Sequence, residues 1–289
     1  MAGTPARISS PDRVVFQDAP YTKQDVADYY RAVGDRLLAG IAHRPLSLVR
    51  CPDGTAGECF FQKHHADSLG DDVRRVMLAQ KSGREPYLYV EDVEGVVDLV
   101  QMNAIEFHPW AARIEDPERP DFMVFDLDPG EGTGWDEVVR GARDVRRRLR
   151  GHGLESFVRL SGGKGAHGVA PIRPGPSWDT LRSFCEAVAV EMAGQAPTRY
   201  VATMAREKRR GRIFIDWLRN ARGSTSVASW SLRARPGAPV AVPIRWEELG
   251  RVAGPAAFDL ERARRRAARL RRDPWEGYAD LDQVLPAPA

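Results

Sequence analysis

Two aspartates separated by one residue follow an apolar run near the middle of the chain. Residues 122–125 read Phe-Met-Val-Phe, which predicts a buried strand, and Asp126 and Asp128 come directly after it. In an extended strand, residues two apart share a face, so both carboxylates point the same way. Two like charges held this close repel each other unless a cation lies between them. The pair therefore suits Mg²⁺ or Mn²⁺, although an aspartate pair that caps the loop after a core strand fits the same residues.

A third acid, Asp216, ends another apolar strand, at residues 213–215. Together with Asp126 and Asp128 it could hold two divalent ions, the arrangement used for in-line displacement at phosphorus. The ions would hold the attacking 3′-oxygen and the leaving pyrophosphate. Basic residues lie on both sides of this acid: 206–210, Arg219, Arg222 and Arg233. Such runs are usually solvated surface, but their position beside a metal site favours phosphate contacts.

A glycine-rich turn at residues 161–167 offers a second anion-binding element. It reads Ser-Gly-Gly-Lys-Gly-Ala-His, between a predicted strand at 157–160 and another at 168–172. Glycines let backbone N–H groups approach an anion closely, and Ser161 and Lys164 add contacts that suit a triphosphate. The spacing is not that of a P-loop, and no helix follows directly. Taken alone, such a motif is more often an ordinary hairpin turn.

Composition sets broad limits. The chain has 289 residues, of which 43% are apolar and 29% charged, with a net charge of +3. It has no apolar run long enough to span a bilayer and no signal peptide at its start, so we expect a cytoplasmic protein. The cysteines are too few for a disulfide framework, and we expect lone thiols. Zinc is disfavoured because Cys51 and Cys59 are too far apart for a zinc knuckle, and His64 and His65 read as surface histidines.

Helical and strand patterns alternate along the chain. Helices are predicted at 22–41, where Thr22 and Asp25 fit a capping box, and at 92–107, 138–149 and 177–192. Strands are predicted at 46–50, 87–90, 122–125, 157–160, 168–172, 213–218 and 227–233. These elements predict an α/β or α+β domain with a mixed, largely antiparallel sheet flanked by helices. No internal repeat and no clear linker interrupts it. Residues 260–272 carry seven arginines, which form either a solvated helix face or an auxiliary DNA contact.

Several motifs occur together in one order. They are Ser-Pro-Asp-Arg at 10–13, Phe-Phe-Gln-Lys-His at 60–64, Glu-Phe-His-Pro-Trp at 106–110, FDLDPG at 125–130, SGGKGAH at 161–167, RIFIDWLRNARG at 212–223 and SLRARPG at 231–237. With them the chain resembles the polymerase domain of bacterial ligase D, an archaeo-eukaryotic-primase-type enzyme of non-homologous end joining. The resemblance implies an RRM-like primase core and a single catalytic domain over residues 10–275. About 10–105 would form the template and 5′-phosphate side and 106–250 the metal and nucleotide core, with a tail at 276–289. It also suggests a stand-alone polymerase.

The resemblance implies a role for each motif. Asp126, Asp128 and Asp216 match the metal-binding carboxylates, with two ions and Mn²⁺ favoured over Mg²⁺. The positions that hold the incoming NTP or dNTP are matched by His108, Ser161, Lys164, His167, Arg209 and Arg233. Phe60 and Phe61 resemble the aromatic platform for the template base, and Arg13 and Lys23 the pair that grips a 5′-phosphate of DNA. Ku and a DNA ligase are further candidate partners.

We therefore expect an enzyme that adds ribonucleotides, and less readily deoxyribonucleotides, to DNA 3′ ends in end joining or gap repair. Two alternatives remain. A strand followed by Asp-x-Asp also opens haloacid-dehalogenase-type phosphatases, but that motif requires Thr or Val where this chain has Gly130. The other is a non-catalytic DNA-end-binding module that has kept the fold, which the presence of all three acids disfavours.

Overall fold

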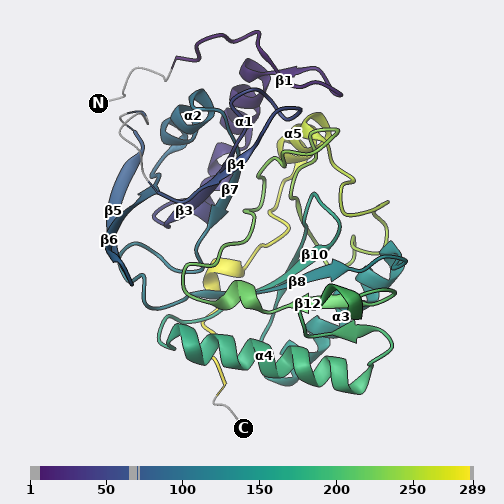
Figure 1. Ribbon diagram of the computed structural model, residues 1–289. Coiled ribbons are helices and arrows are strands. Elements are labelled where there is room, and N and C mark those ends of the chain that lie inside the picture. Colours follow the sequence, from purple (N-terminus) through teal and green to yellow (C-terminus); the bar gives the residue numbers. More distant parts are fainter. Residues whose placement is uncertain (1–6, 65–69, 71, 287–289) are drawn as a thin grey trace. The chain divides into compact units, whose positions relative to one another are not determined.

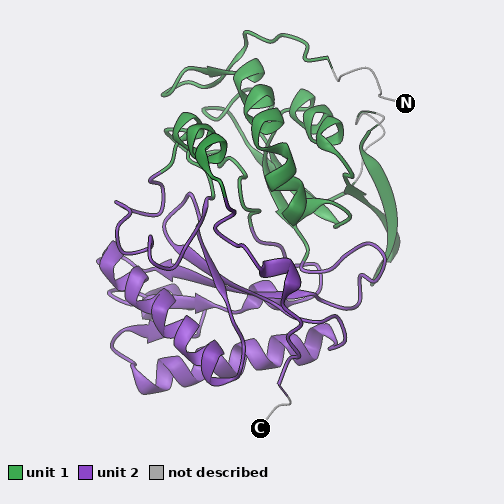
Figure 2. Cartoon of the chain, turned by 180° about the vertical axis from the view of Figure 1, so that it is seen from behind, with its two compact units in different colours: residues 1–110, 227–241, 258–271 green, residues 111–226, 242–257, 272–289 purple. Residues whose placement is uncertain are grey.

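The computed structural model describes residues 7–64, 70 and 72–286 (Figure 1). The chain folds into two compact units, and each is made of segments distant in the sequence (Figure 2). Unit 1 comprises residues 1–110, 227–241 and 258–271. Unit 2 comprises residues 111–226, 242–257 and 272–289, and so it includes the segment expected to be a tail.

Unit 2 is built on a six-stranded sheet with the strand order β11-β12-β8-β10-β9-β13. The strands are β8 (Phe122–Pro129), β9 (Phe157–Leu160), β10 (Ala166–Pro171), β11 (Tyr200–Val201), β12 (Ile213–Asp216) and β13 (Pro243–Ile244). Every pairing is antiparallel except that of β11 with β12. The register places Asp126 of β8 opposite His167 of β10 on one side and opposite Asp216 of β12 on the other.

Helix α3 (Trp135–Gly151) packs on this sheet, and α4 (Trp178–Gln195) belongs to the same unit (Figure 1). A Cβ placed on Gly141 of α3 would lie 3.4 Å from a side-chain methyl of Leu127. Leu127 therefore faces α3, and because side chains alternate along a strand, Asp126 and Asp128 project from the opposite face of the sheet. Alternation thus separates the apolar packing of β8 from its acids.

Unit 1 holds a five-stranded sheet in which β3 pairs with β4, β6 and β7, and β5 pairs with β6. Its strands are β3 (Leu46–Arg50), β4 (Phe60–Gln62), β5 (Arg74–Gln80), β6 (Gly83–Tyr89) and β7 (Ala104–Pro109), and β1 (Val14–Phe16) forms a separate pair with β2 (Tyr21–Thr22). Its helices are α1 (Lys23–Ile41), α2 (Val93–Gln101) and α5 (Leu260–Arg269). The capping box predicted at Thr22 and Asp25 begins α1.

The predicted fold class is confirmed, but two predicted elements are wrong. The helix expected at 92–107 ends at Gln101, because Asn103 adopts a left-handed φ of 65° and residues 104–109 form β7. The described residues 227–233 do not form the expected strand. Within this segment, Leu232 makes an isolated bridge to Val240. Trp230 within it has a φ of 68°, which breaks an extended backbone.

The expectation of lone thiols is also wrong for two of the cysteines. Cys51 and Cys59 form a disulfide, whereas Cys185 is a buried free thiol. The two bonded cysteines lie just outside the ends of β3 and β4, where Arg50 pairs with Phe60, so hairpin pairing brings their Cα atoms to 4.3 Å. Of the two histidines weighed for zinc, His64 pairs with Glu85 at 2.8 Å and His65 lies outside the described residues.

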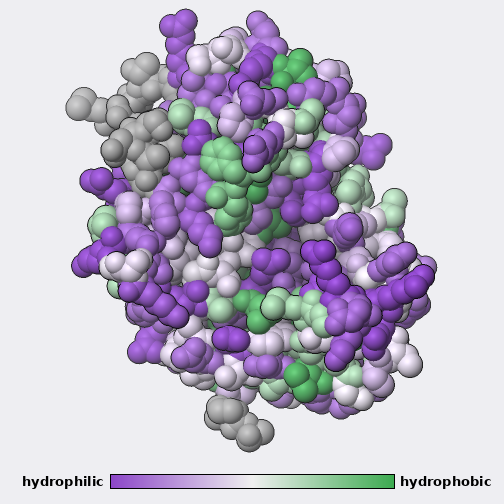
Figure 3. Space-filling view, viewed as in Figure 1, coloured by the Kyte–Doolittle hydropathy of each residue, from purple (hydrophilic) through white to green (hydrophobic). Residues whose placement is uncertain are grey.

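The surface is mostly hydrophilic on the face drawn in Figure 3, with small apolar patches among the polar groups. Exposed large apolar side chains include Phe60 and Phe61. Among the described residues, no helix combines the length and the hydrophobicity that crossing a membrane requires.

Candidate active site

Three carboxylates meet at the centre of the unit 2 sheet. Asp126, Asp128 and Asp216 each offer one oxygen, and these oxygens all lie within 4.8 Å of one another. Asp126 and Asp216 are buried and Asp128 is half-buried. The strand register accounts for this proximity, since Asp216 lies opposite Asp126 and Asp128 follows two residues later. The predicted clustering of the three acids is thus present.

The pKa of Asp128 is raised to about 6, first by burial and then by the charges of Asp126 and Asp216, against the opposing effect of Arg219. The pKa of Asp216 is also raised by burial, while Arg219 lowers it. Ionising several carboxylates this close together costs free energy, unless a cation compensates their negative charge. Closely spaced, partly accessible oxygens are the ligand set that Mg²⁺ and Mn²⁺ bind, so these residues fit a divalent metal site.

Arg219 supplies part of the missing positive charge. Its Nε lies 3.0 Å from Asp216 and 3.7 Å from Asp126, and its side chain is 43% exposed. The sequence placed Arg219 only among general phosphate contacts. Arg219 lies three residues after Asp216, in a short 3-10 helix (Leu218–Asn220) that follows β12. This turn brings its guanidinium back to the acids.

His167 contacts the cluster from β10, with its Nε2 3.3 Å from Asp126. The buried Arg159 donates a hydrogen bond from Nε to Nδ1 of this histidine at 3.1 Å and another from Nη2 to Ser226 at 2.9 Å. Because a guanidinium can only donate, Nδ1 is an acceptor and the imidazole proton lies on Nε2, facing the carboxylate. Arg159 thus fixes the tautomer and orientation of His167. The sequence gave no sign of this role, which follows from the pairing of Arg159 with His167 across β9 and β10.

The glycine-rich turn joins β9 to β10. Ser161 is buried, and its hydroxyl accepts hydrogen bonds from the N–H groups of Gly163 and Gly165. A Cβ on Gly165 would lie 1.9 Å from the carbonyl oxygen of Leu127, so only glycine allows the turn to approach β8 this closely. Lys164 is exposed in the turn, with no hydrogen bond or ion pair to another described residue. The turn is therefore fixed against the acid-bearing strand while its ammonium stays accessible.

Arg209 lies beside the same strand. Its guanidinium stacks over the Phe214 ring at 3.9 Å and donates to the Met204 carbonyl at 2.9 Å. A Cβ on Gly130 would lie 1.8 Å from the Arg209 carbonyl oxygen, so Gly130 lets this segment pass close to the end of β8. Its charge contributes to lowering the pKa of Asp128.

A second polar cluster belongs to unit 1. Glu106 accepts from His108 Nε2 at 2.8 Å, from Arg233 Nε at 2.9 Å and from the N–H of Ala234 at 2.8 Å. Burial opposes ionisation of Glu106, but the hydrogen bond from His108 and the charge of Arg233 outweigh it and lower its pKa to about 2. The carboxylate therefore holds His108 and Arg233 together. Glu106 was not predicted as a site residue, although it lies two residues before His108 on β7.

Aromatic rings border this cluster. Phe60 and Phe61 of β4 are 43% and 46% exposed, unusually accessible for phenylalanines. The Phe61 ring meets His108 edge-on at 5.5 Å between centroids, and the Arg50 guanidinium lies 5.4 Å from the Phe60 ring.

Arg13 and Lys23 lie close together in unit 1. Lys23 is buried, its ammonium donates to the Ser9 carbonyl and to Gln101, and its pKa is lowered by burial and by the charge of Arg13. Arg13 donates to the Pro52 carbonyl at 2.6 Å and to Asn103. The charge of Arg13 disfavours the charged form of Lys23, and an anion beside the pair would offset this repulsion.

Each unit thus gathers part of the predicted residue set. Unit 2 brings together Asp126, Asp128, Asp216 and His167, and Ser161, Lys164 and Arg209 lie on segments that contact β8. Unit 1 brings together His108, Arg233 and Phe61, and separately Arg13 and Lys23.

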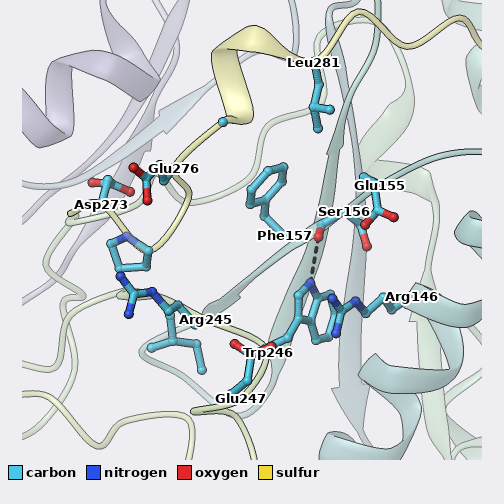
Figure 4. Close-up of a pocket in the computed structure, with 13 residues that line it drawn as sticks. Arg146, Glu155, Ser156, Phe157, Arg245, Trp246, Glu247, Asp273, Glu276 and Leu281 are labelled. Atoms are coloured by element: carbon cyan, nitrogen blue, oxygen red, sulfur yellow. Dashed lines mark hydrogen bonds between the residues drawn. The ribbon is translucent and has the colours of Figure 1, made fainter.

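A pocket of about 380 Å³ in unit 2 shares no residue with the carboxylate cluster. Trp246 donates to the Ser156 carbonyl at 2.7 Å on one side of it, and Arg146 lies 4.8 Å from the Trp246 ring (Figure 4). Arginines and acids both line the pocket.

A mixed sheet that carries clustered acids beside a glycine-rich turn is typical of metal-dependent phosphoryl-transfer enzymes. The family model for the LigD primase-polymerase domain matches residues 22–275. The chain is 38% identical to the multifunctional non-homologous end joining protein LigD of Pseudomonas aeruginosa over 97% of its own length and 34% of that protein's. It is 33% identical to the Mycolicibacterium smegmatis protein of the same description, over 84% of this chain and 32% of that protein.

Structure agrees with sequence. The polymerase domain of Mycobacterium tuberculosis ligase D, solved in complex with DNA, superposes with a TM-score of 0.87 at 30% identity, covering 98% of this chain and 99% of that one. The chain belongs to the LigD primase-polymerase domain family, a family of nucleotidyltransferases. It spans about a third of the length of the curated relatives named above.

Electrostatic strain, meaning the folding free energy lost when Asp128 ionises beside the other acids, can be measured. In EDTA, Asp128→Asn should raise stability at pH 7.5 by about 1–3 kcal/mol, because the folded-state pKa of about 6 lies above the ordinary value and ionisation costs folding energy. The gain should shrink as pH falls through 6 towards 4, where Asp128 is protonated in the wild type. Thermal unfolding checks this. Asp136→Asn in the exposed first turn of α3 is the control and should be neutral or slightly destabilising. Equal or lower stability of Asp128→Asn at pH 7.5 would contradict the strain.

The Arg159 contact also makes a prediction. Arg159→Gln should weaken Mn²⁺ binding about 10-fold or more, because His167 loses the donor that orients it towards Asp126. Binding is measured by electron paramagnetic resonance of free Mn²⁺. Ser226→Ala is the matched control, since it removes a different hydrogen bond of Arg159 and leaves His167 held. A folded Arg159→Gln protein with wild-type Mn²⁺ affinity would show that Arg159 is structural only.

Proposed function

We propose that this chain is a DNA repair polymerase that adds NTPs, and less readily dNTPs, to DNA 3′ ends and fills short gaps bearing a 5′-phosphate. The role would lie in bacterial non-homologous end joining or gap repair. The observation that carries the proposal is the strained Asp126, Asp128 and Asp216 cluster within a LigD primase-polymerase fold. The proposal treats both units as one catalytic domain.

The three aspartates would hold two divalent ions, Mn²⁺ in preference to Mg²⁺, which supply charge neutralisation and orientation for in-line phosphoryl transfer. Arg219 offsets the negative charge of the acids before the nucleotide arrives. His167 hydrogen-bonds Asp126 and keeps that carboxylate oriented. No protein nucleophile is needed, and catalysis rests on positioning and electrostatics.

Two sets of donors suit the phosphates of a nucleotide. The N–H groups and ammonium of the 161–167 turn, with Lys164 accessible, suit the triphosphate, and Arg209 adds positive charge. In unit 1, His108 and Arg233, held by Glu106, present imidazole and guanidinium groups that suit a phosphate.

DNA contacts would come from unit 1. The exposed rings of Phe60 and Phe61 suit stacking on a template base, a role that their 43% and 46% exposure supports. Arg13 and Lys23 would grip the 5′-phosphate of the downstream strand. The ligase D polymerase domain of Mycobacterium tuberculosis has been solved with DNA, which supports DNA as the partner here. Ku and a DNA ligase would be its protein partners, in a cytoplasmic, nucleoid-associated location.

The decisive experiment is extension of a 5′-labelled primer opposite a short gap with a 5′-phosphate, with NTPs or dNTPs and Mn²⁺ or Mg²⁺. Template-directed addition that favours NTPs with Mn²⁺ is expected. Asp126→Ala should abolish addition by the folded protein, because a metal ligand is lost. Retained activity in that variant would contradict the metal assignment, and wild-type protein that binds the DNA without extending it would be an end-binding module instead.

Lys23 has its own test. Lys23→Ala should weaken the preference for a 5′-phosphorylated gap about 10-fold, because a charged contact to the phosphate is worth on the order of 1.5–3 kcal/mol, while addition to a simple primer stays near wild type. Extension rates on gaps with and without the phosphate measure the preference. Equal losses on both substrates would argue against the role.

A further inference from the structure

Helix α5 concentrates positive charge to a degree that the proposed catalytic site does not use. Residues 260–272 contain seven arginines and a single acid, Glu261. The helix is held by its apolar side, where Leu260, Ala263 and Ala267 are buried. Its N-cap, Asp259, accepts from the Arg262 N–H. The fold therefore fixes α5 by its apolar side and leaves most of its arginines exposed.

Four of these arginines share one pocket. It has a volume of about 600 Å³ and is lined by Phe258, Arg262, Arg265, Arg266, Arg269 and Leu270. The four arginines recur at i, i+3, i+4 and i+7, the spacing of one helix face. No acid lines the pocket. The pocket of Figure 4 differs, because its arginines face Glu155, Glu247, Asp273 and Glu276.

The internal contacts of this arginine face are weak enough to be exchanged. Arg262 lies 3.4 Å from Asp259 and Arg265 lies 3.4 Å from Glu261, and both arginine side chains are more than half exposed. Exposed ion pairs of this kind contribute little to stability. Arg266 is different, since its guanidinium lies 5.2 Å from the Phe258 ring and packs there. An anion entering the pocket would thus meet exposed guanidinium groups beside one that is packed on an aromatic ring.

The length of the face identifies the kind of anion. From Arg262 to Arg269 the helix rises about 10 Å, which is about three phosphate spacings along the axis of one DNA strand, or four successive phosphates. A single phosphate would occupy one or two arginines and leave the others repelling each other. We propose that the Arg262–Arg265–Arg266–Arg269 face of α5 binds the phosphate backbone of duplex DNA as a contact additional to the catalytic site. The proposal rests on the proposed function, because the DNA is the same substrate.

The test compares two triple variants with equal charge. Arg262→Gln/Arg265→Gln/Arg269→Gln alters the face and spares the packed Arg266. Arg264→Gln/Arg271→Gln/Arg272→Gln removes three charges from the same segment outside the pocket. Affinity for a blunt 30-base-pair duplex is measured against salt concentration for both. Loss of three phosphate contacts should make the slope of log affinity against log salt about 2–3 units shallower for the first variant, and leave the second near wild type.

Equal slopes for the two variants would overturn the proposal, since general charge would then explain the binding. Equal competition by inorganic triphosphate and by duplex for the wild-type face would also overturn it, as the site would then be one for small anions. If wild-type protein extends no primer but the slopes still differ, the proposed function fails and the DNA contact stands.

Discussion

Mutual repulsion among Asp126, Asp128 and Asp216 is the constraint around which unit 2 is organised. Their oxygens lie within 4.8 Å of one another, and burial with the neighbouring charges raises the pKa of Asp128 to about 6. A fold optimised only for stability would separate these groups. Here β8 directs Leu127 into the apolar contact with α3 and its acids to the other face, while Arg219 and the Arg159–His167 pair hold the cluster in place. The electrostatic cost is retained where a cation would remove it, as expected of a site built for metal-dependent chemistry.

Neighbouring backbone segments pack closely against β8. Gly165 and Gly130 allow the 161–167 turn and the Arg209 segment to pass against β8 at distances that a side chain would forbid. Asn220 ties the loop after β12 back to Val124 through hydrogen bonds in both directions, 2.7 Å each. In unit 1 a buried carboxylate also holds basic side chains in place, since Glu106 accepts hydrogen bonds from His108 and Arg233. In both units a buried carboxylate positions basic groups that are candidates for phosphate binding.

Much of this could be read from the sequence, because the acids and the turn are each local. The apolar runs before Asp126 and Asp216 predicted strands that the structure contains, and the fold class is confirmed. What the sequence could not reveal depends on the register in which neighbouring strands pair. Arg159 reaches His167, and Cys51 reaches Cys59, only through strand register. The helix predicted to 107 overran because apolar spacing continues past Asn103, where a left-handed residue starts a strand.

The central claim is that the acid cluster is completed by a divalent cation. The most direct measurement is calorimetric Mn²⁺ binding at pH 6 and pH 8 in buffers of different ionisation enthalpy, which counts the protons released. With a pKa of about 6, Asp128 should release about half a proton per protein at pH 6 and none at pH 8, and Asp128→Asn should lose the release at pH 6. Saturable binding with that pattern is the result predicted here. Absence of saturable binding, or proton release unchanged in Asp128→Asn, would contradict it.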